Sequence, residues 1–174
     1  MRKAAMGLMT ACFVWLLFPA FGRADVIINE VMASNGYYES GHAWDWVELY
    51  NNGESTENLS GWGFTDSKKD LYRFTFPEGT KIKAGAYLTV WCTGEENQTP
   101  GKGDVFYADF AISSQGETLR LTKPDGETVG KLKLPEQYGC ISYGLPSGGE
   151  IYGYFEHPTR RSEEHTSELQ SHLN

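Results

Sequence analysis

The sequence predicts an all-β domain, built as a sandwich or a barrel. Short β-prone runs alternate with turn residues through the middle of the chain, and no stretch there has the period of a long helix. Aromatic residues make up 14% of the chain, enough to fill a core between sheets with few side chains. Roughly seven or eight short strands, without parallel-sheet crossovers, are typical of sandwiches and barrels.

Each expected strand is a short apolar or alternating run that turn residues bound on both sides. In residues 45–50, the alternation places Val47 and Leu49 on one face and Trp46 and Tyr50 on the other. The expected strands are Val26–Met32, 45–50, 59–66, 71–76, Tyr87–Cys92, Thr118–Thr122, 128–134 and 140–143.

Turn signals connect these strands. Asp125 and Gly126 separate two of the runs and predict a hairpin. Gly61 and Gly116 suit turns that need a positive φ. Residues 93–104 contain Gly, Pro, Asn and Gln, so they are expected to form an exposed loop.

The N-terminus has the organisation of an export signal. Two basic residues precede an apolar run over 4–18, and small residues follow it up to Ala24. Cleavage there would leave Asp25 as the first residue, and the mature chain would be secreted, periplasmic or attached to the cell surface. The run is short for a membrane span, which needs roughly 20 residues. An uncleaved anchor and a lipoprotein acylated at Cys12 are the alternatives.

The C-terminus has a different character. Its sequence RSEEHTSELQSH resembles the translation of a widely used sequencing-library adapter. We therefore expect residues 161–174 to be a disordered artefact and the domain to occupy residues 25–160. The alternative is a polar helical tail that begins at Ser162.

Charge and cysteine content limit the function classes. Residues 25–160 contain 11 basic and 20 acidic residues, which disfavours binding to nucleic acid or to an anionic membrane. Cys92 and Cys140 could pair in an oxidising compartment and contribute roughly 3–5 kcal/mol, or they could be two separate buried thiols. Two cysteines without a CxxC pair argue against a structural zinc site.

Several short motifs in a fixed order resemble a bacterial lamin tail domain over residues 26–154. The resemblance implies an immunoglobulin-like β-sandwich without catalytic residues or cofactors. It also implies the N-terminal module of a larger exported protein, in which a CotH-type kinase or another exported domain often follows. The motifs are Ile28-Asn29-Glu30-Val31, Asp45-Trp46-Val47-Glu48-Leu49-Tyr50-Asn51, Leu59-Ser60-Gly61-Trp62, Phe76-Pro77, Ala84-Gly85-Ala86-Tyr87-Leu88, Phe110-Ala111-Ile112-Ser113, Gly116-Glu117-Thr118-Leu119 and Ser142-Tyr143-Gly144.

The function expected from these observations is a non-catalytic interaction or scaffolding module, monomeric by itself, that binds a protein or a cell-surface polymer. Tyr37, Tyr38 and Trp44 are the candidate surface-binding aromatics, with core or loop packing as their alternative role. The alternative function is an accessory domain of a truncated larger enzyme, whose catalytic part is missing. Neither a nucleophile motif nor a zinc-protease motif supports catalysis within residues 25–160.

Two other sites remain as hypotheses. Glu30 and Glu48 could form an acid–base pair, although we favour structural carboxylates that accept hydrogen bonds beside a strand. Oxygen ligands in 66–70 and 94–97 could hold calcium, but neither segment matches an EF-hand loop, so no metal site is predicted.

Overall fold

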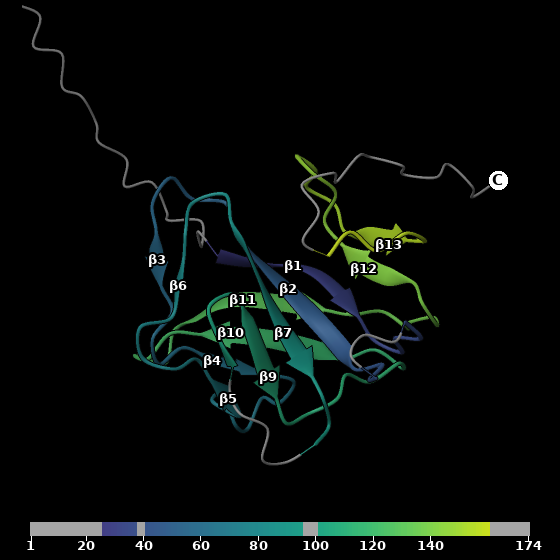
Figure 1. Cartoon of the computed structure of the whole chain (residues 1–174), viewed down its shortest axis with the longest axis horizontal. Coiled ribbons are helices and arrows are strands. Elements are labelled where there is room, and N and C mark those ends of the chain that lie inside the picture. The colour runs from purple at the N-terminus through teal and green to yellow at the C-terminus, as the bar shows by residue number, and fades with distance from the viewer. Residues whose placement is uncertain (1–25, 38–40, 96–100, 161–174) are drawn as a thin grey trace, which may run out of the picture.

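The computed structural model describes residues 26–37, 41–95 and 101–160 (Figure 1). Within these ranges the chain forms strands, turns and loops, and no helix there is long and apolar enough to cross a membrane. The expected signal peptide, residues 1–24, and the adapter-like residues 161–174 lie outside the described residues.

The larger sheet contains the two longest strands of the domain, β1 and β2, side by side at its centre, with β7 next to β2 (Figure 1). Neighbouring strands in it are antiparallel, except for one pair that is parallel. In spatial order its strands are β13 (Gly153–Phe155), β12 (Ser142–Gly144), β1 (Val26–Met32), β2 (Asp45–Asn51), β7 (Tyr87–Cys92), β9 (Val105–Ala108) and β8 (Gly101–Lys102).

A second sheet lies against one face of the first, and a short two-stranded ribbon flanks the pair (Figure 1). The predicted β-sandwich is therefore confirmed. The second sheet has the order β11 (Thr128–Lys133), β10 (Thr118–Thr122), β4 (Gly63–Thr65) and β5 (Phe74–Thr75), and the ribbon pairs β3 (Glu57–Asn58) with β6 (Lys81–Ile82).

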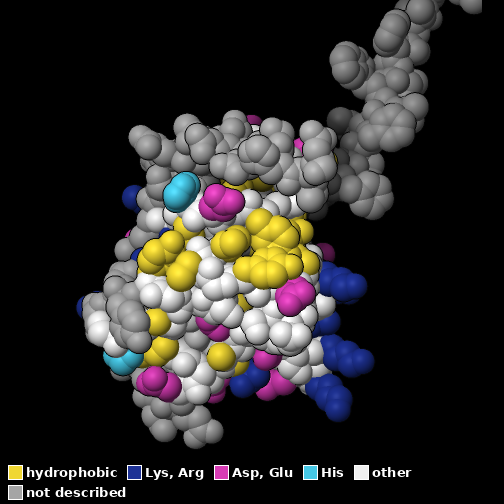
Figure 2. All heavy atoms as spheres, turned by 90° about the vertical axis from the view of Figure 1, so that its right-hand side faces the viewer, with side chains coloured by type: hydrophobic (Ala, Val, Ile, Leu, Met, Phe, Trp, Pro, Cys, Tyr) yellow, Lys and Arg dark blue, Asp and Glu magenta, His cyan; other side chains and the backbone are white. Residues whose placement is uncertain are grey.

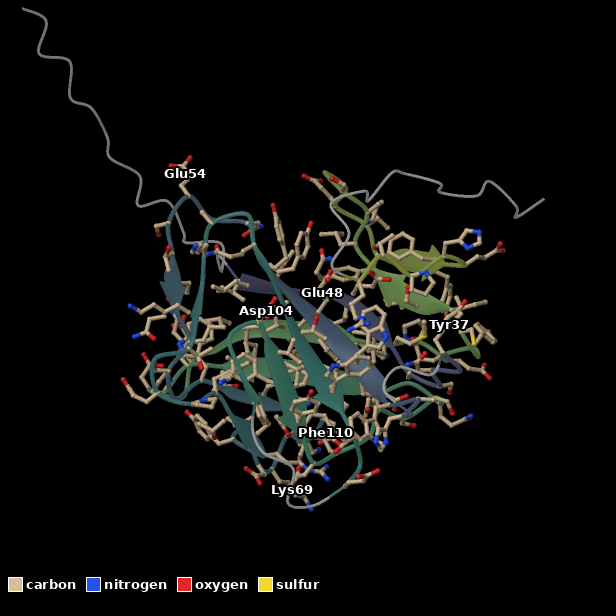
Figure 3. The ribbon with its side chains drawn as sticks, in the orientation of Figure 1. Tyr37, Glu48, Glu54, Lys69, Asp104 and Phe110 are labelled. Atoms are coloured by element: carbon tan, nitrogen blue, oxygen red, sulfur yellow. The ribbon has the colours of Figure 1, made fainter. Side chains whose placement is uncertain are left out.

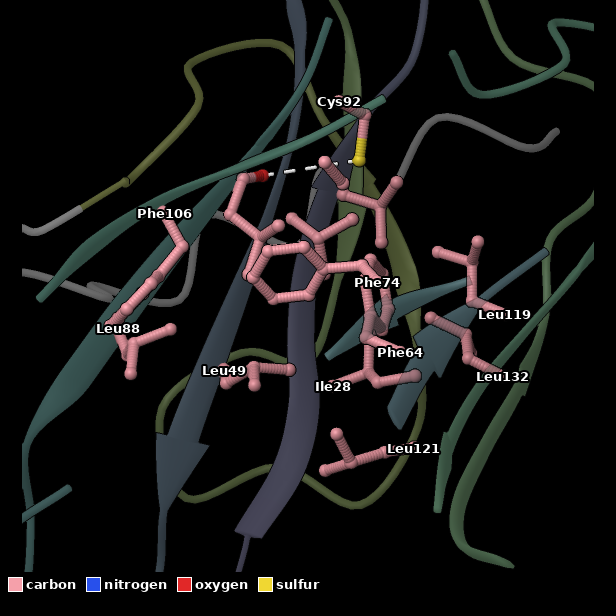
Figure 4. Close-up of a cluster of buried hydrophobic side chains, with 14 of the residues drawn as sticks. Ile28, Leu49, Phe64, Phe74, Leu88, Cys92, Phe106, Leu119, Leu121 and Leu132 are labelled. Carbon is pink, nitrogen blue, oxygen red and sulfur yellow. Dashed lines mark hydrogen bonds between the residues drawn. The ribbon is translucent and has the colours of Figure 1, made fainter. Parts of the chain in front are cut away.

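The main core fills the space between the two sheets (Figure 4). Val47 and Leu49 of β2 are fully buried in it, on one face of the strand as their alternation predicts. The second sheet contributes Leu119 and Leu121 from β10. Because successive side chains of a strand point to opposite faces, Trp46 of β2 leaves this core and belongs to a separate cluster on the outer face.

Three phenylalanines hold one end of the core together. The rings of Phe74 and Phe76 lie 5.0 Å apart, and Phe106 lies 5.4 Å from Phe76, both in edge-to-face arrangements. Such pairs add about 0.5–1.5 kcal/mol to the area that they bury. Phe106 comes from β9, so this cluster attaches the far side of the first sheet to the second sheet.

One expectation about topology is wrong. β7 and β9 pair in parallel, with Thr89 opposite Val105 and Cys92 opposite Ala108, although no parallel connection was expected. Within the segment 93–104, expected to be a loop, Gly101–Lys102 form β8, which pairs antiparallel with β9.

The turn predictions hold at Gly61, which has φ 75°, at Gly116 and at Asp125-Gly126. The Asp125-Gly126 hairpin joins β10 to β11, with Gly126 at φ 91° and a hydrogen bond of 2.8 Å from Lys123 N to Glu127 O. Gly116 has φ 84°, and a Cβ atom there would lie 2.6 Å from Leu134 O. Only glycine fits both the conformation and the space at residue 116.

Candidate binding surface

The outer face of the larger sheet carries a small aromatic cluster, which we call the outer cluster. Met32, Trp46 and Trp91 form it, and Trp44 and Tyr107 pack against it from the sides. The Trp44 ring is stacked on His42, with ring centroids 3.9 Å apart, and meets Tyr107 edge to face at 6.0 Å. The three central side chains come from β1, β2 and β7, so the rigid middle of the sheet positions them.

A row of buried polar side chains crosses the same three strands next to the outer cluster. Glu30 on β1 lies opposite Glu48 on β2, and Glu48 lies opposite Thr89 on β7. All three residues are fully buried. A register shift between Ile28 and Glu30 marks a β-bulge, which places both glutamates on the same face of the sheet. Figure 3 shows Glu48 over the middle of the strands.

The Glu30 carboxylate is satisfied by groups from the C-terminal part of the chain. Thr159 donates its backbone N–H to Oε1 at 3.0 Å and its hydroxyl to Oε2 at 2.8 Å. The Ser142 hydroxyl of β12 also donates to Oε1. The Glu48 carboxylate accepts a hydrogen bond at Oε1 from Asn29 Nδ2 at 2.9 Å. Buried carboxylates that accept this many hydrogen bonds support the structural role favoured from the sequence.

An open hollow of about 370 Å³ lies beside the outer cluster. The Arg160 guanidinium lies over the Trp91 ring at 4.4 Å and over the Trp46 ring at 5.7 Å, as in a cation–π contact. Among the residues that the structure describes, no acid lines the hollow, although residues 25–160 carry almost twice as many acids as bases. Its lining residues are Met32, Asn35, Tyr37, Trp46, Trp91, His157, Pro158 and Arg160.

Local hydrogen bonds fix the loop that forms one wall of the hollow. The side chain of Asn35 accepts from Tyr37 N at 3.0 Å and donates to Trp44 O at 2.8 Å. Ser34 takes up the positive φ of 57° that turns the chain into this loop. Tyr37 is thereby presented with 53% of its surface exposed, at the edge of the hollow (Figure 3).

A second hollow of about 300 Å³ lies on the other side of the buried polar row. Its floor contains the stacked pair Tyr50 and Tyr87, whose ring centroids are 4.6 Å apart. The loop 145–150 forms its wall, and Leu145 N donates to Asn29 O at 2.8 Å to hold that loop against β1. The loop also contributes Ser147 and Glu150, so the lining of this hollow is more polar than that of the first.

The structure places the three sequence-predicted aromatics differently. Tyr37 lines the first hollow, and Trp44 is half-buried against the outer cluster, where its Nε1 donates to Glu95 at 3.2 Å. Tyr38 lies outside the described residues. Sequence reasoning missed Trp46, Trp91 and Arg160 as lining residues. The alternation in 45–50 placed Trp46 on the face opposite Val47 and Leu49, and this signal could have identified it once the core face was known.

The two cysteines are free thiols in the structure. Cys92 is buried in the main core, where its thiol faces Val90 O (Figure 4), and burial raises the pKa of Cys92 well above its usual value. Cys140 is half-buried in the loop before β12, packed against Gly36, with its own N–H donating to Ser34 O at 3.3 Å. The sequence left the pairing of these residues open, and here each has its own packing site.

Of the two segments that could have held calcium, 66–70 lies entirely within the residues that the structure describes. Arg73 donates from Nη1 to both carboxylate oxygens of Asp66, each at 3.0 Å, and Arg73 also lies over the Phe110 ring. Part of 94–97 lies outside the described residues. Among the residues that are described, no group of three or more His, Cys, Asp or Glu side chains is placed to hold a metal ion.

Two carboxyl groups near the sandwich ends have raised pKa values. Burial raises the pKa of Asp45, and hydrogen bonds from the backbone N–H groups of Ile112 and Asn35 oppose the shift. Burial likewise raises the pKa of Glu117, whose carboxylate accepts from Ser113 N at 2.8 Å. Both groups connect loops to the ends of strands, so their role is in the fold.

The two packed sheets, with a row of buried carboxylates tied by hydrogen bonds, define an immunoglobulin-like β-sandwich module. Residues 19–135 match the family model of the lamin tail domain, and the chain belongs to that family, whose domains are non-enzymatic. No curated protein matches the chain. β12, β13 and the segment that reaches Thr159 lie beyond the matched residues.

Proposed function

We propose that this chain is an exported, non-catalytic interaction module that binds a cell-surface polymer or a protein partner through the first hollow. The observation that carries the proposal is the lining of that hollow. Tyr37 offers an exposed aromatic ring, Trp46 and Trp91 lie buried beneath Arg160, and Arg160 and His157 offer positive or polar groups, with no acid among the described lining residues. Concave sites with aromatic walls and a few polar groups are typical of ligand binding.

The rest of the outer face supports binding over catalysis. Glu30 uses its carboxylate oxygens on Thr159 and Ser142, and neither Glu30 nor Glu48 lines a hollow. A general acid or base must reach a bound substrate, and these two side chains are fully buried. Membership of a non-enzymatic family supports the same proposal.

Export is the part of the proposal that depends on the sequence alone, through the signal-like residues 1–24. Expression of the whole chain in a bacterium with a general secretion pathway tests it. We expect the exported product to begin at Asp25, as determined by N-terminal sequencing. Retention of the intact N-terminus in the cytoplasm would contradict this part of the proposal.

Binding is tested by sedimentation with insoluble peptidoglycan, chitin and cellulose, and by tryptophan fluorescence with soluble fragments of each polymer. Tyr37→Ala removes an exposed ring from the hollow, and Tyr72→Ala is the matched control because Tyr72 lies on the second sheet's side, bonded to Lys123 O. We expect Tyr37→Ala to weaken binding at least about fivefold, since one aromatic contact contributes about 1 kcal/mol. Equal binding by both variants and the wild type would contradict the hollow as the site.

A further inference from the structure

Besides the first hollow, the outer edge of β13 is a second candidate interaction surface. β13 ends the larger sheet, and β12 is its only sheet neighbour among the described residues. No residue from Ile151 to Glu156 is buried. An edge strand presents unpaired backbone N–H and C=O groups, which another extended chain can pair with.

This edge strand is short, but no charged residue, proline or bulge within it blocks pairing. Proteins blunt an edge with lysine, proline or a bulge, but β13 reads Gly153-Tyr154-Phe155 and pairs with β12 in regular register. Tyr152 donates its hydroxyl to Ile28 O at 2.6 Å, so the segment leading into β13 is attached to the middle of the sheet. The edge is therefore exposed and held in place.

Exposed tyrosine rings form an aromatic surface beside this edge. Tyr154 is 41% exposed, and its ring lies 5.5 Å from that of Tyr138 and 5.1 Å from that of Tyr143. Tyr138 is itself 49% exposed. Figure 2, which faces this side of the molecule, shows hydrophobic side chains gathered here. Apolar side chains of an added strand would lie across these rings.

Charge determines which partner fits. Glu136, Glu150 and Glu156 are exposed around the edge, and the sequence has no lysine or arginine between Lys133 and Arg160. In Figure 2 the acidic side chains border the hydrophobic cluster, whereas the lysines and arginines in view stand apart from it. A second copy of this edge would place glutamates against glutamates, which is unfavourable. A basic chain would place opposite charges together.

We propose that the β13 edge binds an extended, basic segment of a partner protein, which joins the larger sheet as an eighth strand. Backbone hydrogen bonds to Gly153–Phe155 supply the pairing, the tyrosines contact the apolar residues of the segment, and the glutamates contact its lysines or arginines. This surface lies beyond the family-matched residues 19–135 and is separate from the hollow of the proposed function.

The probe is an eight-residue peptide of alternating lysine and valine, titrated into the exported chain. Hydrogen exchange at the amides of Gly153–Phe155 is followed together with the Kd. We expect binding to slow exchange at these amides. The same peptide N-methylated on its four central amides keeps its charge and side chains but cannot extend a sheet, so we expect it to bind at least tenfold more weakly.

The triple variant Glu136→Lys, Glu150→Lys, Glu156→Lys tests the charge. We expect this variant to lose its affinity for the lysine–valine peptide and to bind the corresponding glutamate–valine peptide. Its thermal unfolding should stay close to that of the wild type because all three side chains are exposed. Tyr37→Ala, the hollow variant, is expected to bind the peptide normally, so failure of the hollow and failure of the edge are distinguishable.

Three results would overturn the proposal. Equal affinity for the methylated and unmethylated peptides would show charge adsorption without strand pairing. Peptide binding that leaves exchange at Gly153–Phe155 unchanged would place the peptide elsewhere. Concentration-dependent dimerisation with protection of these amides in the absence of peptide would make a second copy of the chain the occupant.

Discussion

The carboxylate of Glu30 on the first strand accepts two hydrogen bonds from Thr159, close to the end of the described chain. The pair brings the C-terminal segment across the outer face, where the next residue, Arg160, lies over Trp91 and Trp46. Because Glu30 is fully buried, its hydrogen bonds offset a large desolvation cost. The wall of the first hollow therefore depends on a contact between the two ends of the domain.

Glu30→Gln is expected to lower the free energy of unfolding by about 1–3 kcal/mol. The amide nitrogen of glutamine faces donors where the carboxylate oxygen accepted, so at least one buried hydrogen bond is lost. Urea denaturation measures the change, and Glu54→Gln, at an exposed position (Figure 3), is the control with an expected change below about 0.5 kcal/mol. Equal stability of the two variants would argue against Glu30 as the attachment point.

Phe106→Ala is expected to destabilise the domain by about 3–5 kcal/mol. The substitution removes a fully buried ring that touches Phe74 and Phe76 and leaves a cavity between the sheets. Ile151→Ala, at a residue 81% exposed, is the control and should change stability little. A small effect of Phe106→Ala would mean that β9 does not pack on the second sheet.

Arg160→Met is expected to change the intrinsic tryptophan fluorescence and to lower stability by about 0.5–1 kcal/mol. Methionine keeps much of the apolar stem but removes the guanidinium from the rings of Trp91 and Trp46. Lys68→Met, at an exposed residue, controls for the loss of a positive charge. An emission spectrum identical to that of the wild type would contradict the contact.

Stability should depend on pH through Asp45 and Glu117, whose pKa values are raised by burial. A carboxyl with a higher pKa in the folded chain takes up its proton there first, so protonation favours folding. Its contribution is full below the unfolded pKa of about 4 and is lost as the pH rises through the folded pKa. Hence wild type should gain stability relative to the double variant Asp45→Asn, Glu117→Gln between pH 7 and pH 4.

Urea denaturation of both chains at the two pH values checks this prediction. Because both chains share all other titrating groups, the difference between them isolates the two carboxyls. A difference that is constant with pH, or one that shrinks for the wild type at pH 4, would show that burial does not raise the two pKa values.

Local pattern was sufficient to predict much of the fold. The alternation in 45–50 predicted the faces of Val47 and Trp46, and Asp125-Gly126 predicted the β10–β11 hairpin. The parallel pairing of β7 with β9 could not be predicted in this way. It depends on where β9 lies in space relative to β7, and a two-residue strand such as β8 carries no periodic signal.

The candidate site was less accessible to sequence reasoning. Tyr37 is one of the three aromatics that the sequence offers as candidates for surface binding, and it lines the hollow. Arg160 and His157 were missed because they reach the hollow only through the long-range contact between Thr159 and Glu30. Contacts between segments this far apart depend on tertiary packing, which spacing along the chain does not encode.

The central claim is that the residues after the family-matched segment complete the larger sheet and form a wall of the hollow. Hydrogen exchange of the amides in 142–160 tests it most directly, because β12 pairs with β1 through Glu30–Gly144 and Val31–Tyr143. We predict protection of Ser142–Gly144 comparable to that of β1, and reduced protection across 142–160 in Glu30→Gln with β10 and β11 unchanged. Exchange of 142–160 at the rate of an unstructured chain in the wild type would contradict the claim.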